Sequence, residues 1–584
     1  MTERAASTSP TPGRVAVVLL AVALAAVVAW MHAPLFASGG VLGAPGTDVV
    51  RAAWGLDHQV RALPGLPFWT DRIGFPEGVK IIVLPMVSTL FGAPLHVLLG
   101  PIAGYDAWVL TLLWASGFCT ALLVRAMSGS SAAGLLAGVA IVVQPMILLA
   151  ITDGTPEYVA LWPLPAALLL TWAARREAGL GLPIAAGLSW AIVALDSPYH
   201  AVFALPFVPI ALWGYSRRNF LVLCTAGVLG GVAVIGAYVG LPVGDVEDQR
   251  RGTNAVQLFV WNQWETGNVG KPWDYTLAPS FIPVATVVGA LALAALRPVR
   301  TLPWLIVGVL CVTFAIGDNP ENALWLERAH GPTAGSVGRA VVAFNETVHV
   351  PVVRFPRRWL VPAALALSAA AGIGLSRLPW EWLRLGIAVP AAVAVLVHTL
   401  ALTGYRRALP TFPTPNAAFA TFIGEHPASG ALLALPTIRA ANTIATRRED
   451  IPIWANLDGA IRSADQIWIQ LATGRANVYV PHGMRTMERR TARERELETL
   501  LRDLDDLTLP QTTGRAIPPS ATQEPPRRAL AAGRLVDSGL AFVALDAALY
   551  GPEGLALAKA PFADRIVEER TFEDGTGVVV WVVE

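Results

Sequence analysis

The chain has 584 residues, of which 54% are hydrophobic and only 15% are charged. A soluble domain usually has about 25% charged residues, so most of this chain is expected to lie in lipid. The 43 basic and 42 acidic residues nearly cancel, which argues against a nucleic-acid partner. The three cysteines, Cys119, Cys224 and Cys311, lie far apart in apolar runs and are expected to be core residues rather than a disulfide framework or metal site.

The N-terminal segment has features of a signal peptide. Arg4 and Arg14 precede the run "VAVVLLAVALAAVVAW", and "LFASGG" resembles a cleavage site. The apolar run approaches the ~20 residues that cross a bilayer, and many more apolar segments follow it. We therefore expect an uncleaved first transmembrane helix.

Hydropathy predicts eleven membrane spans, several of them short or interrupted by proline. Such breaks persist at membrane depth where protein or water satisfies the freed backbone groups. Residues 81–101 are expected to form a re-entrant or interfacial hairpin instead of a span, aided by Pro85 and Pro94. The expected spans lie near residues 14–36, 105–125, 131–151, 156–174, 182–196, 198–215, 219–241, 278–296, 301–317, 359–377 and 384–404.

The short loops between these spans differ in charge. One set is basic, and the alternate set holds Asp153, Glu157 and Asp196 without lysine or arginine. Basic loops stay in the cytoplasm, so we expect the N-terminus inside and the first outer loop, residues 37–104, outside. The basic loops contain Arg125, Arg175, Arg176, Arg217, Arg218, Arg297, Arg300, Arg377 and Arg384.

Residues 405–584 have a different composition, with more charge, proline and arginine. The stretches "GALLALPT", "LAFVALD" and "TGVVVWVVE" are typical of buried strands. Leucines at helical spacing within 486–507 predict an amphipathic helix that packs on the sheet. The predicted organisation is a transmembrane domain, residues 1–404, followed by an extracytoplasmic α/β domain, residues 405–584.

The first outer loop is rich in polar groups. Asp48 in "GTDVVRAAW" is positioned to cap a helix. Asp57 and His58 are expected on that same helix, where Asp57 either serves as a second functional acid or pairs with Arg61 at i,i+4.

Asp153, Glu157, Asp196 and His200 lie at the outer ends of spans, where "TDGTPEYV" and "LDSPYH" break the helices. Ionisable groups at membrane depth usually face the bundle interior and mark functional sites. Alternatively, Asp153 and Asp196 cap the helices that begin near Pro156 and Pro198. The sequence leaves both interpretations open.

Arg354, Arg357 and Arg358 in "VVRFPRRWL" precede the tenth span on the expected outer side, where arginine is not favoured. This placement suggests an anionic partner, because the planar guanidinium fork suits phosphate. The alternative is that these side chains extend to lipid headgroups and anchor the span.

The layout of an acidic first outer loop, a hydrophobic bundle and an extracytoplasmic tail resembles the GT-C superfamily of membrane glycosyltransferases, which take sugars from polyprenyl-phosphate carriers. At motif level the resemblance rests on "GTDVVRAAW" with "LPFWTDRIGFPEG", "DSPYH", "RFPRRWLVPAALALSAAAGIGL" and "IWIQLATGR". It implies that Asp48 is the catalytic base and that one or more of the three arginines bind the donor phosphate. The closely spaced first-loop acids common in that superfamily are absent, since Asp48 and Asp57 are nine residues apart.

The resemblance further implies a hexosyltransferase-type enzyme of the cell inner membrane. Its partners would be a polyprenyl-phosphate-linked sugar, a lipid or glycan acceptor, and membrane lipids. No cofactor is certain, but a divalent Mg or Mn ion shared by Asp48 with Asp153, Glu157 or Asp196 is chemically allowed. The alternative functions are a non-enzymatic flippase of lipid-linked glycan, against which the absence of an internal repeat counts, and a structural or sensory membrane protein.

Overall fold

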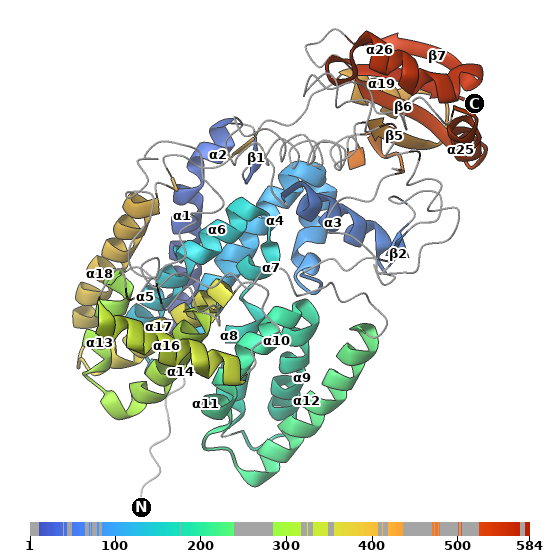
Figure 1. Ribbon diagram of the computed structural model, residues 1–584. Coiled ribbons are helices and arrows are strands. Elements are labelled where there is room, and N and C mark those ends of the chain that lie inside the picture. Colours follow the sequence, from blue (N-terminus) through green and yellow to red (C-terminus); the bar gives the residue numbers. More distant parts are fainter. Residues whose placement is uncertain are drawn as a thin grey trace, which may run out of the picture.

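The protein is an α-helical polytopic membrane protein with a C-terminal α/β domain (Figure 1). The described part of this computed structural model comprises residues 11–38, 40–43, 49–64, 69–70, 72, 79–80, 85–175, 177–238, 284–316, 324, 327, 331–348, 356–403, 405–406, 411–412, 418–435, 470–471, 473–476, 478, 500, 504, 525–572 and 578–584.

The first half of the helical domain contains the helices that surround the breaks expected near residues 154 and 197. They are α1 (Thr11–Met31), α2 (Ala33–Ser38), α3 (Val49–Ala62), α4 (Thr89–Ser128), α5 (Ser131–Val142), α6 (Pro145–Asp153), α7 (Pro156–Val159), α8 (Pro163–Ala174), α9 (Gly181–Asp196), α10 (Pro198–Ala204), η1 (Leu205–Phe207), α11 (Val208–Leu212) and α12 (Arg217–Tyr238).

The second half completes the bundle and leads to the tail. Its helices are α13 (Val284–Ala294), α14 (Pro298–Ile316), α16 (Pro332–Val348), η4 (Pro356–Trp359), α17 (Leu360–Leu375) and α18 (Glu381–Thr403). Each of the eleven expected spans coincides with one of these helices or with a broken set of them. The expected span 131–151, for example, is the pair α5 and α6, which are bent by 41° to each other.

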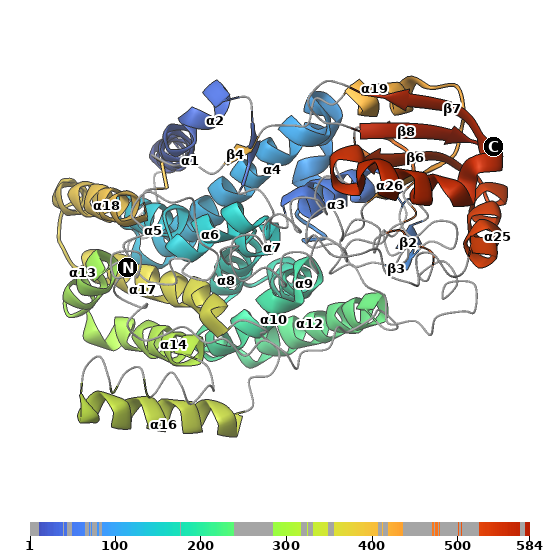
Figure 2. The same cartoon turned by 45° about the horizontal axis from the view of Figure 1, so that its top comes forward.

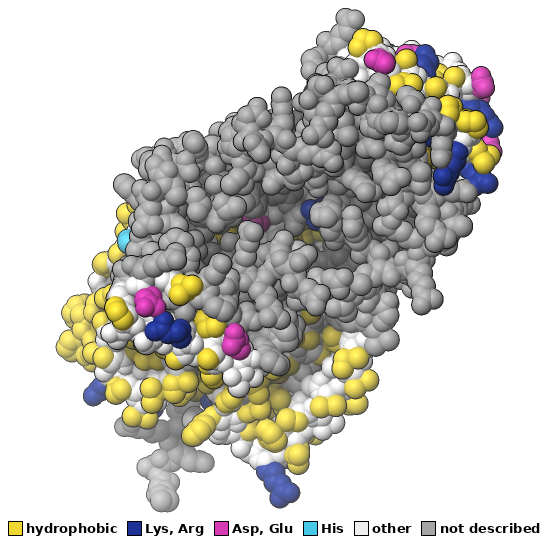
Figure 3. Space-filling view, viewed as in Figure 1, with side chains coloured by type: hydrophobic (Ala, Val, Ile, Leu, Met, Phe, Trp, Pro, Cys, Tyr) yellow, Lys and Arg dark blue, Asp and Glu magenta, His cyan; other side chains and the backbone are white. Residues whose placement is uncertain are grey.

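Six of the described helices are long and apolar enough to cross a membrane, or seven if the bent pair α5–α6 counts as one span. Their outward faces are apolar, as Leu229 and Ile235 of α12 show at 66% and 64% exposure. In Figure 3, hydrophobic side chains cover the visible lower flank of the helical domain. Such a surface is favourable in lipid and unfavourable in water.

Helix α4 contains a sharp break at Gly100, which has φ 81° and ψ 176°. A Cβ placed on Gly104 would lie 2.6 Å from the Cα of His96, although residues eight apart in a straight helix are about 12 Å apart. The chain therefore turns back on itself here, at the end of the segment 81–101 that was expected to form a hairpin. The depth of this segment in a membrane stays a prediction.

The loops divide between two ends of the bundle. At the end called here the inner end, Arg125 donates to the Gly13 carbonyl at 3.2 Å, and Arg297 reaches the Ser376 carbonyl at 3.3 Å. At the opposite, outer end, strand β1 (Val41–Leu42) pairs with β4 (Thr411–Phe412), so the first loop and the start of the tail lie together. The loop sets predicted from charge are thus spatially separated, while the absolute orientation stays a prediction.

Small residues let the helices approach closely. A Cβ on Gly374 of α17 would lie 1.9 Å from the Leu293 carbonyl oxygen of α13. Likewise, a Cβ on Gly117 of α4 would lie 3.1 Å from the carbonyl of Gly138 in α5. Close backbone approach at glycine is typical of helix packing in membranes, where dispersion contacts replace the hydrophobic effect.

The tail forms a four-stranded sheet in the order β5-β6-β8-β7 (Figure 2). Strand β5 runs parallel to β6, whereas β6–β8 and β8–β7 are antiparallel. Helix α19 covers one face, and α25, α26 and η6 cover the other. The elements are β5 (Ala431–Leu435), β6 (Leu540–Asp546), β7 (Ile566–Thr571), β8 (Val578–Val583), α19 (Ala418–Glu425), α25 (Pro525–Asp537), α26 (Ala547–Lys559) and η6 (Ala560–Arg565). A separate two-stranded hairpin in the first loop pairs β2 (Trp69–Thr70) with β3 (Val79–Lys80).

The three expected strands are confirmed as β5, β6 and β8. The expected helix 486–507 lies mostly outside the described residues, but Leu500 and Leu504 are described and are buried in the core of the sheet. The boundary expected at residue 404 stays a prediction, although α18 ends at Thr403.

Candidate functional site

Two helix breaks bring charged side chains together at the outer end of the bundle. Helix α6 ends at Asp153, Gly154 adopts φ 68°, and α7 begins at Pro156. Glycine permits this left-handed C-terminal turn, and proline suits the first position of the next helix. The break places Asp153 and Glu157 on either side of a tight turn, both partly buried.

Arg358 of η4 lies against this turn. Its guanidinium carbon is 4.1 Å from the centre of the Tyr158 ring and 5.3 Å from that of Tyr199. It also donates a hydrogen bond to the Tyr158 hydroxyl. Stacking on aromatic faces and hydrogen bonding together hold the guanidinium in one orientation.

The charges around Arg358 favour its cationic form. Burial acts to lower the pKa of Arg358, but the facing tyrosines and the carboxylates of Glu157 and Asp153 raise it, and the net shift is upward. The structure therefore brings together three residues that the sequence singled out separately, namely Arg358, Glu157 and Asp153.

Aromatic residues enclose the rest of this cluster. The Tyr158 and Tyr199 rings are 5.2 Å apart, and Phe203 lies 5.1 Å from Trp359. His200 is fully buried beside Phe203 and the backbone of Glu157. His200 thus supports the cluster from the inside rather than facing solvent. We refer to Asp153, Glu157, Tyr158, Tyr199 and Arg358 as the Arg358 cluster.

The Arg358 guanidinium packs against the Tyr158 and Tyr199 rings, while the alternative that the three arginines extend to lipid headgroups stays a prediction. Arg354 lies outside the described residues. Arg357 belongs to η4 by its backbone, but its side chain also lies outside the described part of the chain.

A second polar network lies in the first outer loop. The Asp57 carboxylate accepts from Arg61 Nε at 2.9 Å, Arg72 Nη1 at 2.6 Å and His96 Nε2 at 3.0 Å. The expected i,i+4 pair with Arg61 is therefore confirmed. Burial of Asp57 raises the pKa of its carboxyl, but the charges and hydrogen bonds of Arg72 and Arg61 outweigh this and lower the pKa below 3.8.

The other two candidates of this loop lie beside the network. His58 is buried and stacks on Trp54 with ring centres 5.2 Å apart, which indicates a packing role. Asp48 lies outside the described residues. Helix α3 does begin at the next residue, Val49, as the capping alternative requires.

Asp196 connects the first outer loop to the helices that carry the Arg358 cluster. Its carboxylate accepts from the Ser88 backbone N–H at 2.7 Å and from the Ser88 hydroxyl at 2.9 Å. Ser88 in turn accepts from the Trp108 and Trp162 indoles, through its carbonyl and its hydroxyl. Asp196 is fully buried in this contact and immediately precedes the turn that leads to Tyr199.

The capping alternatives for the two span-end aspartates are wrong. Ser197 occupies the N-cap position of α10, and Thr155 that of α7, each without a side-chain capping bond. Asp153 instead ends α6. Asp196 instead accepts a hydrogen bond from the backbone N–H of Ser88, in the turn before α4, 108 residues away in the sequence.

Sequence reasoning missed Tyr158, Tyr199, Arg72, His96 and Ser88. The tyrosines stand inside the motifs "TPEYV" and "DSPYH" that were already singled out for their acids. A search for aromatic neighbours of span-end charges would have found them. The partners of Asp57 and Asp196 carry no such local signal.

The described residues do not form a divalent-metal site. No three histidine, cysteine, aspartate or glutamate side chains gather among them, and Asp196 uses both of its oxygens on Ser88. What the Arg358 cluster offers instead is an oriented cation with two carboxylates close by. This set can hold a phosphate and, next to it, a hydroxyl.

No protein-family model and no curated protein sequence matches the chain. Among solved structures, arabinofuranosyltransferase AftD from Mycobacteria superposes with a TM-score of 0.51 and 14% identity, over 97% of this chain and 40% of AftD. The chain thus spans about two fifths of the length of that protein.

Two other solved structures align more weakly. The Archaeoglobus fulgidus oligosaccharyltransferase aligns at TM-score 0.46 and 10% identity, over 97% of this chain and 74% of its own. ArnT from Cupriavidus metallidurans aligns at 0.39 and 14%, over 97% of each chain. Scores below 0.5 do not establish a shared fold, so the first match alone bears on the architecture. On that match, this chain shares the fold of the aligned part of the arabinofuranosyltransferase AftD.

Proposed function

We propose that the protein is a membrane glycosyltransferase that moves a sugar from a polyprenyl-phosphate donor to an extracytoplasmic lipid or glycan acceptor. The observation that carries this proposal is the Arg358 cluster: a guanidinium held between two tyrosines, beside two carboxylates, at the breaks of outer-end helices. The fold shared with a glycosyltransferase supports it.

Arg358 is the residue proposed to bind the donor phosphate. When the glycosidic C–O bond breaks, negative charge develops on the phosphate oxygen that leaves. A preoriented cation in a partly buried site stabilises this charge more strongly than water does. The tyrosine rings hold the guanidinium plane, so little reorganisation is needed as the reaction proceeds. Arg354 and Arg357, close in sequence, are proposed to assist.

The second half of the reaction forms a bond between the anomeric carbon and an acceptor oxygen. The acceptor hydroxyl loses its proton to a carboxylate within hydrogen-bond reach. We propose Asp48 as this base, as the superfamily resemblance implies. Glu157 and Asp153 are proposed to position Arg358 and to bond sugar hydroxyls, and Asp57, His58, Asp196 and His200 to support the site.

The first outer loop is well placed to complete such a site. Ser88 of this loop is hydrogen-bonded to Asp196 at the end of α9, and the next helix, α10, carries Tyr199. On the other side, Gln470 of the tail donates to the Arg72 carbonyl. We propose that loop 37–104 and the domain 405–584 both lie outside the cell inner membrane, with the N-terminus in the cytoplasm and the acceptor between loop and domain.

The test uses the purified full chain in lipid nanodiscs with polyprenyl-phosphate sugars and membrane-extracted acceptors. Arg358→Gln is expected to lower transfer by about a hundredfold, the loss typical of one preorganised electrostatic contact. Arg358→Lys should recover part of it. Arg218→Gln, an exposed inner-end arginine, is the matched control and should retain full activity.

Two results would overturn the proposal. One is the absence of transfer from every polyprenyl-phosphate donor tested, and the other is full activity in Arg358→Gln. If reconstituted vesicles instead move the lipid-linked sugar across the bilayer without forming a glycosidic bond, the protein is a flippase.

A further inference from the structure

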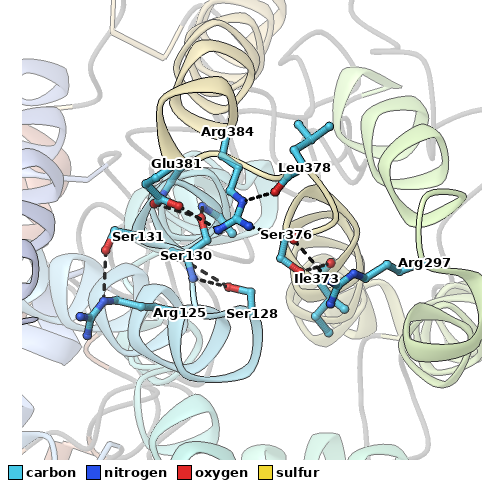
Figure 4. Close-up of polar contacts among 12 residues, drawn as sticks. Arg125, Ser128, Ser130, Ser131, Arg297, Ile373, Ser376, Leu378, Glu381 and Arg384 are labelled. Carbon is cyan, nitrogen blue, oxygen red and sulfur yellow. Dashed lines mark hydrogen bonds and ion pairs between the residues drawn. The ribbon is translucent and has the colours of Figure 1, made fainter. Parts of the chain in front are cut away.

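Four arginines gather at the inner end of the bundle, where α13, α14, α17 and α18 meet. Arg297 donates to the Ser376 carbonyl at 3.3 Å, and Arg384 donates to the same oxygen at 3.2 Å (Figure 4). Two guanidinium groups that share one acceptor lie only a few ångströms apart. Arg300, in the first turn of α14, and Arg377, just after α17, complete what we call the inner arginine cluster.

Acidic residues offset little of this charge. Within the described chain, Glu381 is the carboxylate that pairs with the cluster, through Arg384 at 3.1 Å, and it also accepts from Ser130 and the Ala132 N–H. The side chains of Arg300 and Arg377 are exposed and have no hydrogen bond or ion pair among the described residues. Burial and the charges of Arg300, Arg377 and Arg384 lower the pKa of Arg297. An anion at this position would relieve the repulsion.

Two further features indicate that the cluster lies at the level of lipid headgroups. Trp380 and Trp382 stack on each other with ring centres 5.6 Å apart and remain 58% and 66% exposed. Exposed tryptophan is typical of the membrane–water interface. Beside Arg300, Val299 and Leu302 are 85% and 54% exposed, which gives α14 an apolar face next to the charges.

We propose that the inner arginine cluster binds the phosphate of an anionic phospholipid, whose acyl chains lie along the exposed face of α14. Arginine forks bind phosphate oxygens in pairs, and basic pockets between helices on the cytoplasmic side of membrane proteins recognise anionic headgroups. The apolar surface beside the charges favours a lipid over a free phosphate ion. This site is at the opposite end of the bundle from the Arg358 cluster and does not depend on the proposed function.

The experiment measures lipid binding to the intact protein by native mass spectrometry in neutral detergent, with phosphatidylglycerol as the probe. The test variant is Arg300→Gln/Arg377→Gln, which removes two exposed side chains of the cluster. The matched control is Arg217→Gln/Arg218→Gln, which removes two arginines from the inner-end start of α12. Thermal melting confirms that both variants are folded.

Each arginine near an anionic headgroup contributes roughly fivefold to binding. The test variant is therefore expected to bind phosphatidylglycerol about tenfold or more weakly, and the control less than twofold more weakly. Phosphatidylcholine should bind all three proteins equally weakly. An equal loss in both variants would show a diffuse surface charge and overturn the site, as would unchanged binding in the test variant. Full displacement of the lipid by millimolar inorganic phosphate would assign the site to a free anion and would also overturn the proposal.

Discussion

The two ends of the helical domain satisfy their polar groups in opposite ways. At the inner end, arginines donate to carbonyl oxygens where helices finish: Arg175 reaches the Ile210 carbonyl at 2.5 Å, and Arg297 and Arg384 share that of Ser376. Cations at helix C-termini complement the helix dipole. At the outer end, carboxylates accept instead, as Asp196 does from the Ser88 N–H and Asp57 from Arg72.

This difference determines which charges are available to ligands. Inner arginines satisfy backbone carbonyls, which carry no net charge, so the positive charge of that end persists. At the outer end, Asp57 pairs with Arg72 inside the first loop, and Asp196 fixes that loop to the bundle through Ser88. The Arg358 cluster is the exception at the outer end, because its cation faces neutral rings as well as carboxylates. We therefore expect the protein to lose much stability when a buried ion pair of the outer end is broken.

The largest loss is expected from Asp57→Asn. The Asp57 side chain is only 2% exposed and faces Arg61, Arg72 and His96, so neutralising it leaves the mostly buried Arg72 guanidinium without its counter-ion. Removing one partner of a buried pair costs about 3–5 kcal/mol. Chemical denaturation, or limited proteolysis of the first loop, would measure this.

Arg61→Gln is the control for that measurement. The Arg61 side chain is 62% exposed, and exposed ion pairs contribute about 1 kcal/mol or less. If Arg61→Gln destabilised the loop as much as Asp57→Asn does, the network would depend on Arg61 rather than on the buried carboxylate.

A loss of stability nearly as large is expected at His32, which links the first and last helices of the bundle at the outer end. Its Nδ1 donates to the Val28 carbonyl at 2.9 Å, so in the neutral ring Nε2 accepts from the Tyr405 hydroxyl at 3.0 Å. His32 is fully buried in this contact.

His32→Phe keeps a ring of similar bulk but removes both hydrogen bonds of His32. Loss of a buried hydrogen-bond partner costs about 1–3 kcal/mol. Thermal melting of wild type and His32→Phe would measure this cost, and equal melting would show that the contact between His32 and Tyr405 contributes nothing.

Much of the fold could be predicted from local pattern. Long apolar runs predict spans because a bilayer requires about 20 apolar residues, and short continuous apolar runs predict the buried strands β5, β6 and β8. The Asp57–Arg61 pair was predictable because its members are one helical turn apart. Strand β7 was missed because five of its six residues are exposed and most are polar, as suits the edge of a sheet.

The site was less predictable because its contacts join distant segments. Arg358 meets Tyr158 across 200 residues, and Asp196 meets Ser88 across 108. The sequence identifies such residues as unusual for their depth in the membrane, but it contains no spacing rule that pairs them. Their partners follow only from the way in which the broken helices pack.

A smaller loss of stability is expected at the inner end, where the helices are held together by close packing. In Gly374→Ala the new methyl would lie 1.9 Å from the Leu293 carbonyl, so α13 and α17 must move apart. Overpacking of this kind costs about 1–3 kcal/mol. Gly289→Ala on α13, where no atom lies within 4 Å, is the control and should melt at or above the wild-type temperature. Equal melting of both variants would mean that this contact contributes nothing.

The smallest effect is expected from Asp196→Asn, which keeps the shape of the side chain but removes its charge. The amide oxygen can still accept from the Ser88 N–H, while the second oxygen, which accepts from the Ser88 hydroxyl at 2.9 Å, is replaced by a donor. Loss of one side-chain hydrogen bond costs about 1 kcal/mol. Because Ser88 also accepts from the Trp162 indole at 2.8 Å, Asp196→Asn should loosen the start of α4 together with Trp162. Hydrogen exchange at residues 86–90 would then rise while exchange at α17 stays unchanged. A uniform rise across both regions would instead show that Asp196 stabilises the whole bundle, and the outer loop would no longer be a separately anchored unit.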